Sequence, residues 1–333
     1  MTKRLLLIAP VFFGYYKNII DMASNMGYQV DYICDSPSNS NIFKAISRVN
    51  GNFTKKITNN YFKKKVLPKI EHEKYDQIFM IGGMTFSLTP KMIGQMRKIN
   101  KTAIFSLYQW DSEKNLPYVK SIHKYFDYVF TFDRLDASAN KSKYIFLPLF
   151  YIPSYRKIAD TNMASFQYDC MYVGTAHPKK FYDIEKMSKE LRKVYPKQFI
   201  YHYMPSKLKY IYHKLSAPEY KSVKYSNFQS KKLSSEYLLR TIANSKCILD
   251  APQAGQTGLT IRTIECLGAK RKLITTNTDI VNYDFYRPEN IYIYTGKFDF
   301  NNVFFNETYQ DIDPKIYDKY SLKNWLKTIL ENT

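Results

Sequence analysis

The sequence predicts an α/β protein made of two successive units, each with a doubly wound parallel sheet. Short apolar runs rich in β-forming residues alternate with amphipathic stretches of helix length. The alternation breaks once, after Pro148, and then restarts. The chain has 333 residues, of which 45% are hydrophobic and 24% are charged, so it has enough apolar material for two buried cores.

Expected strands and helices alternate through the first half. Leu5–Ala9 is predicted to be a buried strand, and Tyr15–Met26 a helix that ends at Gly27. The other elements expected before Pro148 are a helix over Pro90–Ile99 and strands over Gln29–Cys34, Gln77–Ile81, Thr102–Leu107, Tyr128–Phe132 and Tyr144–Leu147. Strands that alternate with helices pair in parallel, with helices on both faces of the sheet.

The same alternation returns after a break. Residues 150–166 contain Pro153 and several polar residues, which indicates a linker. We therefore expect a first domain over 1–152, a linker over 153–167, a second domain over 168–312 and a helical tail over 313–333. The elements expected after the linker are strands over Cys170–Val173, Gln198–Tyr203, Lys246–Asp250, Lys272–Thr276 and Ile291–Tyr294, and helices over Lys179–Val194, Ser235–Asn244, Gly258–Gly268 and Leu322–Leu330.

The chain carries 50 lysines and arginines against 29 aspartates and glutamates, a formal net charge of +21. Such an excess favours a phosphorylated substrate, an anionic membrane surface or a nucleic acid as partner. Most of it lies in Phe43–Lys74 and in Lys179–Lys232. Two solvated helical faces in a lysine-rich protein are the alternative explanation.

Several classes are excluded by absent patterns. No apolar run approaches the roughly 20 residues of a membrane span, and the apolar start lacks a signal-peptide cleavage site. The first loop is not GxGxxG, so NAD is not expected. The four cysteines are far apart, which fits buried thiols in a reducing cytoplasm and makes zinc unexpected. We therefore expect a cytoplasmic protein without a metal.

The most informative segment is 243–270, which reads as strand, glycine-containing loop, helix and strand. Gly255 and Gly258 allow the backbone to approach a ligand closely. The helix that begins near Leu259 offers free N–H groups and a positive dipole end to an anion. Arg262 and Glu265 are three residues apart and share a helix face. A capped helix with an Arg–Glu pair and no ligand is the alternative.

This segment resembles bacterial GT-B glycosyltransferases of the capsule and lipopolysaccharide type (glycosyl transferases group 1, CgeB-like). The resemblance covers roughly Thr102–Tyr294. It rests on Gln256–Thr260, the following Arg262–Glu265 and, in the order the family shows, Trp110–Ser112, Phe126–Phe130, Leu147–Leu149, Tyr168–Gly174, Leu273–Asn277 and Phe285–Asn290. It implies two Rossmann-like domains facing a central cleft, with the tail helix packed back on the first domain.

The resemblance also implies the donor site. Glu265 would bind the donor ribose, and the Gly258–Thr260 amides would bind the donor diphosphate, faced by Gly174 and Thr175. The remaining expected donor-binding residues are Lys179, Gln256, Thr257, Leu259 and Arg262. Many relatives carry a second acid about seven positions before the ribose-binding glutamate. This sequence has Gln256–Gly258 there, so neither sugar recognition nor stereochemistry can be inferred.

Two further side chains are candidates for catalysis. Asp111 follows an apolar strand and could deprotonate an acceptor hydroxyl, unless it merely caps a helix. His177 follows the strand that ends at Gly174 and could serve in proton transfer or bind a donor phosphate, unless it is an ordinary loop residue. Lys180 is a candidate like Lys179, Glu113 is a weaker second base, and Gly14, Tyr15 and Gly82–Gly83 are expected to line the acceptor side.

We therefore expect a glycosyltransferase. Its partners would be a nucleotide-sugar donor, a surface polysaccharide or lipid-linked acceptor, and an anionic membrane at which the protein is peripheral. The resemblance implies that it needs no cofactor or metal, since GT-B enzymes usually neutralise the leaving diphosphate with helix dipoles and basic side chains. Alternatives are a phosphoalditol or CMP-sugar transferase of the same fold, and a nucleic-acid-binding protein whose Tyr/Lys-rich stretch Tyr201–Tyr225 stacks bases.

Overall fold

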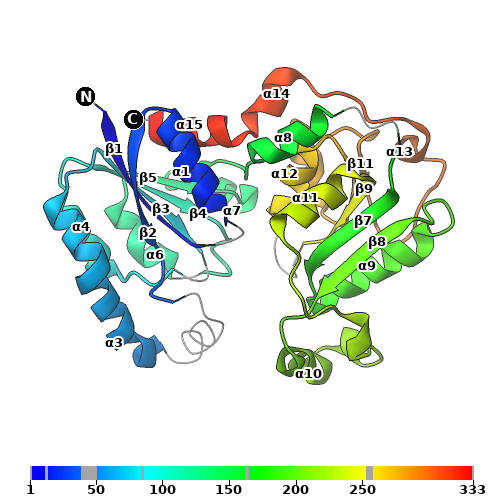
Figure 1. The fold of residues 1–333 in the computed structure, drawn as a ribbon, viewed down its shortest axis with the longest axis horizontal. Helices are drawn as coiled ribbons and strands as arrows, with labels where there is room; N and C mark the ends of the chain where they lie inside the picture. The colour runs from blue at the N-terminus through cyan, green and yellow to red at the C-terminus, as the bar shows by residue number, and fades with distance from the viewer. Residues whose placement is uncertain are drawn as a thin grey trace. The chain divides into compact units, whose positions relative to one another are not determined.

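The computed structural model describes residues 2–11, 14–38, 51–83, 86–116, 118–161, 165–252 and 258–331, except for the side chains of residues 51–53. The chain divides into two compact units. Unit 1 comprises Met1–Pro148 together with Leu322–Thr333, and unit 2 comprises Leu149–Ser321. Each unit contains its own sheet, flanked by helices (Figure 1).

The sheet of unit 1 has six parallel strands in the order β2-β1-β3-β4-β5-β6. From β1 the chain first adds β2 on one side and then crosses to add β3 on the other. The strand order therefore reverses between β1 and β3. The strands are β1 (Lys3–Ala9), β2 (Tyr28–Cys34), β3 (Gln77–Gly82), β4 (Ile104–Gln109), β5 (Tyr128–Thr131) and β6 (Ile145–Phe146).

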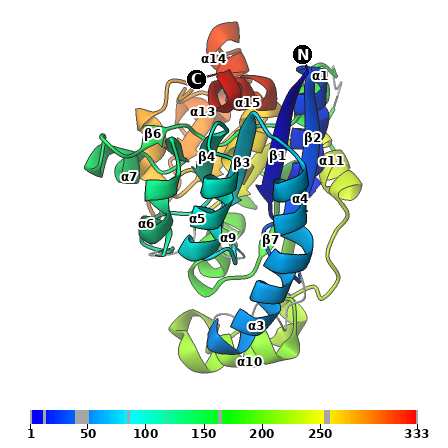
Figure 2. The same cartoon turned by 90° about the vertical axis from the view of Figure 1, so that its left-hand side faces the viewer.

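Helices cover both faces of this sheet (Figure 2), because successive residues of a buried strand point to opposite faces. Leu6 and Ile8 join one core with residues of η2, α4 and α5. Leu7 is in register with Phe79, whose ring contacts Trp325 of α15 on the other face. The helical segments are α1 (Tyr15–Asn25), α3 (Gly51–Tyr61), the π-helical η2 (Phe62–Val66), α4 (Leu67–His72), α5 (Pro90–Ile99), α6 (Val119–Ile122), η3 (His123–Tyr125), α7 (Arg134–Ala139) and α15 (Leu322–Glu331).

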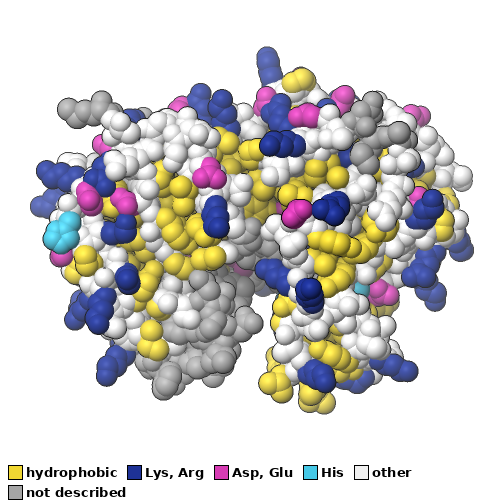
Figure 3. Space-filling view, viewed as in Figure 1, with side chains coloured by type: hydrophobic (Ala, Val, Ile, Leu, Met, Phe, Trp, Pro, Cys, Tyr) yellow, Lys and Arg dark blue, Asp and Glu magenta, His cyan; other side chains and the backbone are white. Residues whose placement is uncertain are grey.

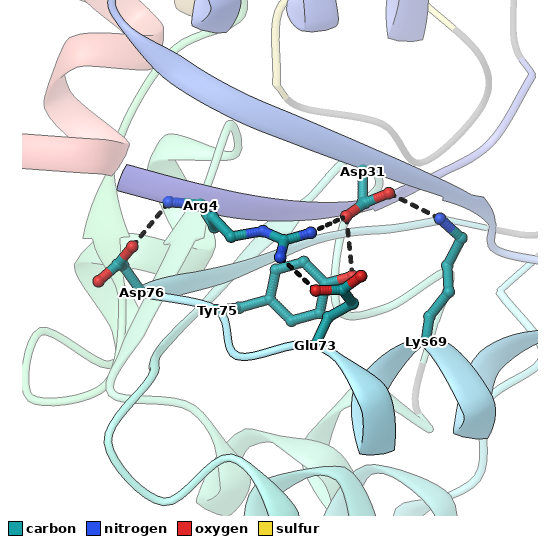
Figure 4. A network of polar contacts seen from close by, with 6 residues as sticks. All are labelled: Arg4, Asp31, Lys69, Glu73, Tyr75 and Asp76. Carbon is teal, nitrogen blue, oxygen red and sulfur yellow. Dashed lines mark hydrogen bonds and ion pairs between the residues drawn. The ribbon is translucent and has the colours of Figure 1, made fainter. Parts of the chain in front are cut away.

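A network of polar contacts ties the end of α4 to the first two strands (Figure 4). Arg4 of β1 pairs with Glu73 and, at 3.1 Å, with Asp31 of β2. Asp31 also pairs with Lys69 at 2.7 Å and accepts a hydrogen bond from the Tyr75 hydroxyl at 3.0 Å. Arg4 lies near the amino end of β1, away from the edge where doubly wound sheets bind ligands. We therefore assign this network a structural role.

The last helix of the chain, α15, packs on the sheet of unit 1. The Trp325 ring lies 4.8 Å from that of Tyr108, and the Gln77 side chain donates a hydrogen bond of 2.6 Å to the Leu330 carbonyl. Leu326 is fully buried. The tail expected over 313–333 begins with α14 (Pro314–Lys319), which belongs to unit 2, so the chain returns to unit 1 only at Leu322.

The sheet of unit 2 has five parallel strands in the order β11-β10-β9-β7-β8. Its strand order reverses between β7 and β9. The strands are β7 (Tyr168–Thr175), β8 (Gln198–Tyr203), β9 (Ser245–Asp250), β10 (Lys272–Thr275) and β11 (Ile291–Ile293). The helical segments are α8 (Pro153–Ala159), α9 (Pro178–Leu191), α10 (Lys207–Ser216), η4 (Pro218–Tyr220), η5 (Tyr225–Asn227), α11 (Ser235–Ala243), α12 (Ile261–Gly268), η6 (Thr278–Asn282), α13 (Val303–Asn306) and α14.

The segment expected to be a linker over 153–167 contains helix α8. Pro153 occupies the first turn of α8, where its missing N–H has no partner to lose and its fixed φ angle suits the helix. The proline that indicated a break in the sequence therefore starts a helix instead. Tyr155 and Ile158 of α8 are buried, and α8 packs on α11 and α12.

In the part of the chain that the structure describes, no helix combines the length and the apolar character needed to cross a membrane.

Candidate functional site

The candidate residues of unit 2 flank the point where its strand order reverses. Doubly wound sheets bind ligands beyond the carboxyl ends of their strands at this point. Gly174 and Thr175 end β7 on one side of it. On the other side, β9 ends at Asp250, and Gly258–Thr260 lead into α12. Gln256 and Thr257, also expected here, lie outside the described residues.

A polar cluster lies where β9, α9 and α12 meet. Asp250, only 1% exposed, pairs with Lys180 of α9 at 3.0 Å. Its other carboxylate oxygen accepts hydrogen bonds from the hydroxyls of Thr260 and Thr263, the latter at 3.3 Å. Asp250 is not among the residues expected from the sequence, although an acid at the end of an apolar strand is a usable signal. The cluster fixes the first turn of α12 against the sheet.

The first turn of α12 is capped from within. The Thr260 side chain accepts a hydrogen bond from the Thr263 N–H at 3.3 Å. Gly258 and Leu259, which precede the cap, are buried. The Thr260 hydroxyl is therefore occupied by the cap and by Asp250. The group that remains for a ligand is the backbone at the start of α12.

The half-buried Arg262 and the buried Glu265 form an ion pair of 2.6 Å on α12. Glu265 is 3% exposed. Burial is the main cause that raises the pKa of the Tyr155 phenol well above its usual value, with a contribution from the Glu265 carboxylate and a hydrogen bond to it. The spacing predicted that Arg262 and Glu265 share a face. It could not predict that Tyr155, from α8, lies against both of them.

Gly174 lies against the side chain of Tyr172. A Cβ at Gly174 would overlap the Tyr172 phenol group. The Tyr172 hydroxyl is buried and makes no hydrogen bond with the described residues. Burial, followed by the Asp250 charge, raises the pKa of this phenol. Packing against Tyr172 therefore requires glycine at 174, near the end of strand β7.

The two lysines at the start of α9 have different surroundings. Lys179 pairs with Asp183 at 2.8 Å on the exposed face of the helix. Lys180, the next residue, points instead toward Asp250 and the end of β9. Of these two lysines, Lys180 is the one placed beside the candidate ligand site.

His177 precedes α9 and lies in basic surroundings. Burial, followed by the charges of Lys209 and Lys180, lowers the pKa of His177 to about 4. Its ring lies 6.4 Å from that of His213 in α10. At neutral pH His177 is therefore an uncharged imidazole, able to donate one hydrogen bond and accept another.

The candidate residues of unit 1 likewise lie at the carboxyl ends of its strands. Gly14 adopts a left-handed conformation, with φ 77°, just before α1. The ring of Tyr15 lies 5.9 Å from that of Trp110, which follows β4. The Trp110 N–H donates to the Gly82 carbonyl at 2.8 Å. The ends of β1, β3 and β4 thus come together where the strand order reverses.

Asp111 caps a turn. Its Oδ1 accepts hydrogen bonds from the Ser112 N–H at 2.9 Å and from the Asn115 side chain at 2.8 Å. Glu113, the weaker candidate, pairs with Lys120 at 2.5 Å and accepts a hydrogen bond from the Tyr144 hydroxyl. Both acids therefore have structural partners, and Asp111 is the one next to Trp110 at the end of β4.

Among the residues described, no cluster of three or more histidines, cysteines, aspartates or glutamates is arranged to hold a metal ion.

No protein-family model and no curated protein sequence matches the chain, but solved structures match its whole length. HepE from Anabaena, in complex with UDP and glucose, is 10% identical, with a TM-score of 0.56 over 100% of this chain and 99% of HepE. WaaB, a lipopolysaccharide outer core galactosyltransferase in its apo form, is 14% identical, with a TM-score of 0.54 over 99% of this chain and 100% of WaaB. The chain has the GT-B fold.

A third similar structure shows that the GT-B fold alone does not identify the reaction. UDP-GlcNAc 2-epimerase from Methanocaldococcus jannaschii is 12% identical, with a TM-score of 0.53 over 99% of both chains. An epimerase is thus about as similar in fold as the two glycosyltransferases. The reaction is therefore determined by the side chains at the site and not by the fold.

Proposed function

We propose that the chain is a glycosyltransferase that takes a sugar from a nucleotide-sugar donor bound to unit 2. The observation that carries this proposal is the arrangement between β7 and β9. There Lys180 and the capped start of α12 lie opposite Gly174 and Thr175, in a chain that matches GT-B glycosyltransferases over its full length.

In this proposal the donor diphosphate lies at the start of α12. The backbone of Gly258–Thr260 and the helix dipole supply favourable partial charge, and the Lys180 ammonium supplies a full charge. Lys180 takes the role given to Lys179 in the sequence analysis, because the Lys179 side chain is on the exposed face with Asp183. The site is proposed to work without a metal, which activity in the presence of EDTA would test.

Glu265 is proposed to accept hydrogen bonds from the donor ribose. Its carboxylate now pairs with Arg262, so ribose binding requires this ion pair to rearrange and frees the Arg262 guanidinium for a phosphate. E265Q and R262Q separate this role from a structural one. If the pair only holds α12 to α8, both variants lower the melting temperature while nucleotide affinity stays unchanged.

Lys180 gives a sharper test of the donor site. K180Q removes the charge and keeps a hydrogen-bond donor for Asp250, and K179Q is the matched control on the exposed face. Calorimetric titration with UDP, GDP, ADP, CDP and CMP should give one preferred nucleotide, bound about tenfold more weakly by K180Q. A preference for CMP would favour the CMP-sugar alternative. Salt-sensitive binding of any oligonucleotide, with no nucleotide bound, would favour the nucleic-acid alternative.

The acceptor is proposed to bind unit 1 at the ends of β1, β3 and β4, where Asp111 would remove the proton of its hydroxyl. D111N is a clean test because the amide oxygen can still accept the hydrogen bonds from Ser112 and Asn115. Transfer should fall at least 10²-fold with nucleotide affinity unchanged. H177N tests the second candidate, an uncharged imidazole beside Lys180, in the same assay.

Epimerisation is the second candidate, favoured by the similarity to UDP-GlcNAc 2-epimerase. Incubation with the preferred nucleotide sugar separates the two reactions. A transferase releases free nucleotide only as the acceptor gains sugar, whereas an epimerase gives a new nucleotide sugar without an acceptor.

The proposed acceptor is a surface polysaccharide or lipid-linked oligosaccharide, with the protein peripheral at a bacterial membrane. A lipopolysaccharide enzyme, WaaB, is among the similar structures.

A further inference from the structure

Helix α10 presents an apolar stripe to solvent. Leu208, Ile211, Tyr212 and Leu215 are 79%, 50%, 67% and 85% exposed. They recur at the spacing of one helix face, and no residue of α10 is buried. The opposite side of the helix has partners within unit 2, since the ring of Tyr210 packs on Tyr225 and Phe228.

The segment that carries α10 is an addition to the sheet. β8 ends at Tyr203 and α11 begins at Ser235, and the residues between them project from the sheet of unit 2 (Figure 1). Phe181, Met204, Tyr220 and Phe228 form most of a small apolar cluster of their own at its base. The cluster supports α10 from one side and leaves its apolar stripe uncovered.

The segment that carries the stripe is rich in lysine. Of the lysines in α10, Lys214 donates to the Val223 carbonyl at 2.9 Å, and the Lys207 ammonium lies 5.9 Å from the centre of the Tyr225 ring. Residues 205–232 contain seven lysines and a single acid, Glu219. Figure 3 shows hydrophobic side chains and lysines together over the part of unit 2 where Figure 1 places α10. An exposed apolar stripe in a lysine-rich segment is the pattern of a helix that lies in the interface of an anionic bilayer.

We propose that α10 docks this protein on an anionic phospholipid membrane, with its apolar stripe among the acyl chains and its lysines among the headgroups. The charge selects this occupant, because seven lysines against one acid in residues 205–232 complement an anionic headgroup layer. α10 follows β8 at the carboxyl edge of the sheet and brings His213 close to His177. Docking therefore places the candidate site of unit 2 near the membrane. This proposal specifies the membrane contact that the proposed function includes, and it does not depend on the transferase reaction.

Co-sedimentation of the full chain with vesicles tests the apolar stripe. The wild type should bind phosphatidylcholine vesicles that contain 40% phosphatidylglycerol, bind pure phosphatidylcholine weakly, and lose affinity as salt rises. L208S/L215S should bind at least tenfold more weakly. The control, V194S/V281S, removes two exposed apolar side chains elsewhere in unit 2 and should stay within twofold of the wild type. All four side chains are exposed, so the circular dichroism melt should not change.

Matched charge variants test the lysines. K207Q/K221Q/K224Q and K315Q/K323Q/K327Q each remove three exposed lysines, so their net charges are equal. Only the first should weaken vesicle binding. In L208W, fluorescence from the new indole should be quenched by lipids brominated on their acyl chains, which headgroup binding alone would not cause. Equal loss in both triple variants, wild-type binding by L208S/L215S, or no vesicle binding at all would overturn the proposal.

Discussion

His123 is a buried imidazole in unit 1, and its chemistry makes stability depend on pH. It is 5% exposed, its Nε2 lies 2.5 Å from the Gln109 side-chain oxygen, and its ring packs edge-on against Tyr144. Burial, followed by the charge of Lys143, lowers the pKa of His123 to about 4. The folded protein therefore keeps this side chain neutral at a pH where an unfolded chain already protonates it.

The sign of the pH effect follows from this difference. As the pH falls from about 6.5 to about 4, the unfolded state takes up a proton that the folded state does not, so unit 1 loses stability at up to about 1.4 kcal/mol per pH unit. H123Q cannot titrate and should lose about 2 kcal/mol less between pH 7 and pH 5. Urea denaturation followed by tryptophan fluorescence measures this loss of stability in unit 1, since both tryptophans, Trp110 and Trp325, lie there.

The control is H72Q, which changes an exposed histidine of α4 and should keep the wild-type slope. Equal slopes in H123Q and the wild type would show that His123 protonates without cost in the folded state.

At the residue scale, the sequence predicts which residue types belong to the site better than it predicts where their side chains point. The lysine pair at the start of α9 is evident from the sequence, but a step of 100° along the helix decides that Lys180 reaches Asp250 while Lys179 pairs with Asp183. The same limit applies to Glu265. Its spacing from Arg262 is local, whereas its burial depends on Tyr155, which only the tertiary fold brings near.

At the scale of elements, α15 is held to unit 1 by its apolar face. Leu326 is fully buried, whereas the neighbouring Lys327 side chain is 58% exposed. L326A should destabilise unit 1 by about 2–5 kcal/mol through lost burial and a cavity. K327A should change stability by less than about 0.5 kcal/mol. Urea unfolding monitored by tryptophan fluorescence compares the two, and equal midpoints would mean that α15 is not part of the cooperative unit.

Helix α12 approaches the chain around Tyr151 closely at Gly268. A Cβ there would overlap the Tyr151 side chain, which is 1% exposed, and the Gly268 carbonyl accepts a hydrogen bond of 2.6 Å from the Tyr317 hydroxyl. G268A should cost about 1–3 kcal/mol by overpacking, which lowers the melting temperature of unit 2 by roughly 2–4 °C per kcal/mol.

Differential scanning calorimetry measures this effect, with tryptophan fluorescence to identify the transition of unit 1. The matched control is G83A, because a Cβ at Gly83 meets no atom within 4 Å, and it should leave both transitions unchanged. A G268A protein that melts like the wild type would show that α12 shifts without cost.

Helices and strands are predicted well where one hydrophobic periodicity dominates. They are predicted poorly where a residue type occurs in two different structural contexts. The apolar spacing of 322–330 predicts a helix, and α15 covers Leu322–Glu331. Pro153 is ambiguous, because proline both breaks helices and starts them, and α8 begins there. Helix α10 is not predicted from the Tyr/Lys-rich stretch after β8, because its apolar residues face solvent and do not belong to a core.

At the scale of the whole molecule, the fold class follows from the alternation of strands and helices, since parallel strands need helical crossovers. The structure has this architecture, with two parallel sheets and a match to GT-B structures along the chain. Strand order does not follow from the alternation. Strand order is set by the edge of the sheet to which each crossover adds the next strand. It places Gly14, which follows β1, and Gly174, near the end of β7, beside the points where the two strand orders reverse.

The path of the chain predicts how the two units behave when separated. Unit 2 is one continuous segment, 149–321, whereas unit 1 needs both ends of the chain. A fragment of residues 149–321 should therefore fold alone and, if the donor site is as proposed, bind the preferred nucleotide with the affinity of the whole protein. A fragment of residues 1–148 lacks α15 and exposes the sheet face that contains Phe79 and Tyr108, so it should unfold at much lower urea concentrations.

The two places where the chain passes between units are close together, which allows a decisive control. Tyr151 and Ser321 form a parallel β-bridge, and the Tyr151 N–H donates to the Tyr320 carbonyl at 2.9 Å. Pro148 and Leu322 are therefore within reach of a flexible linker of about six residues. A chain that joins 1–148 to 322–333 in this way should regain cooperative urea unfolding, because α15 again covers the sheet. Equal stability of the joined and truncated chains would mean that α15 contributes little to unit 1.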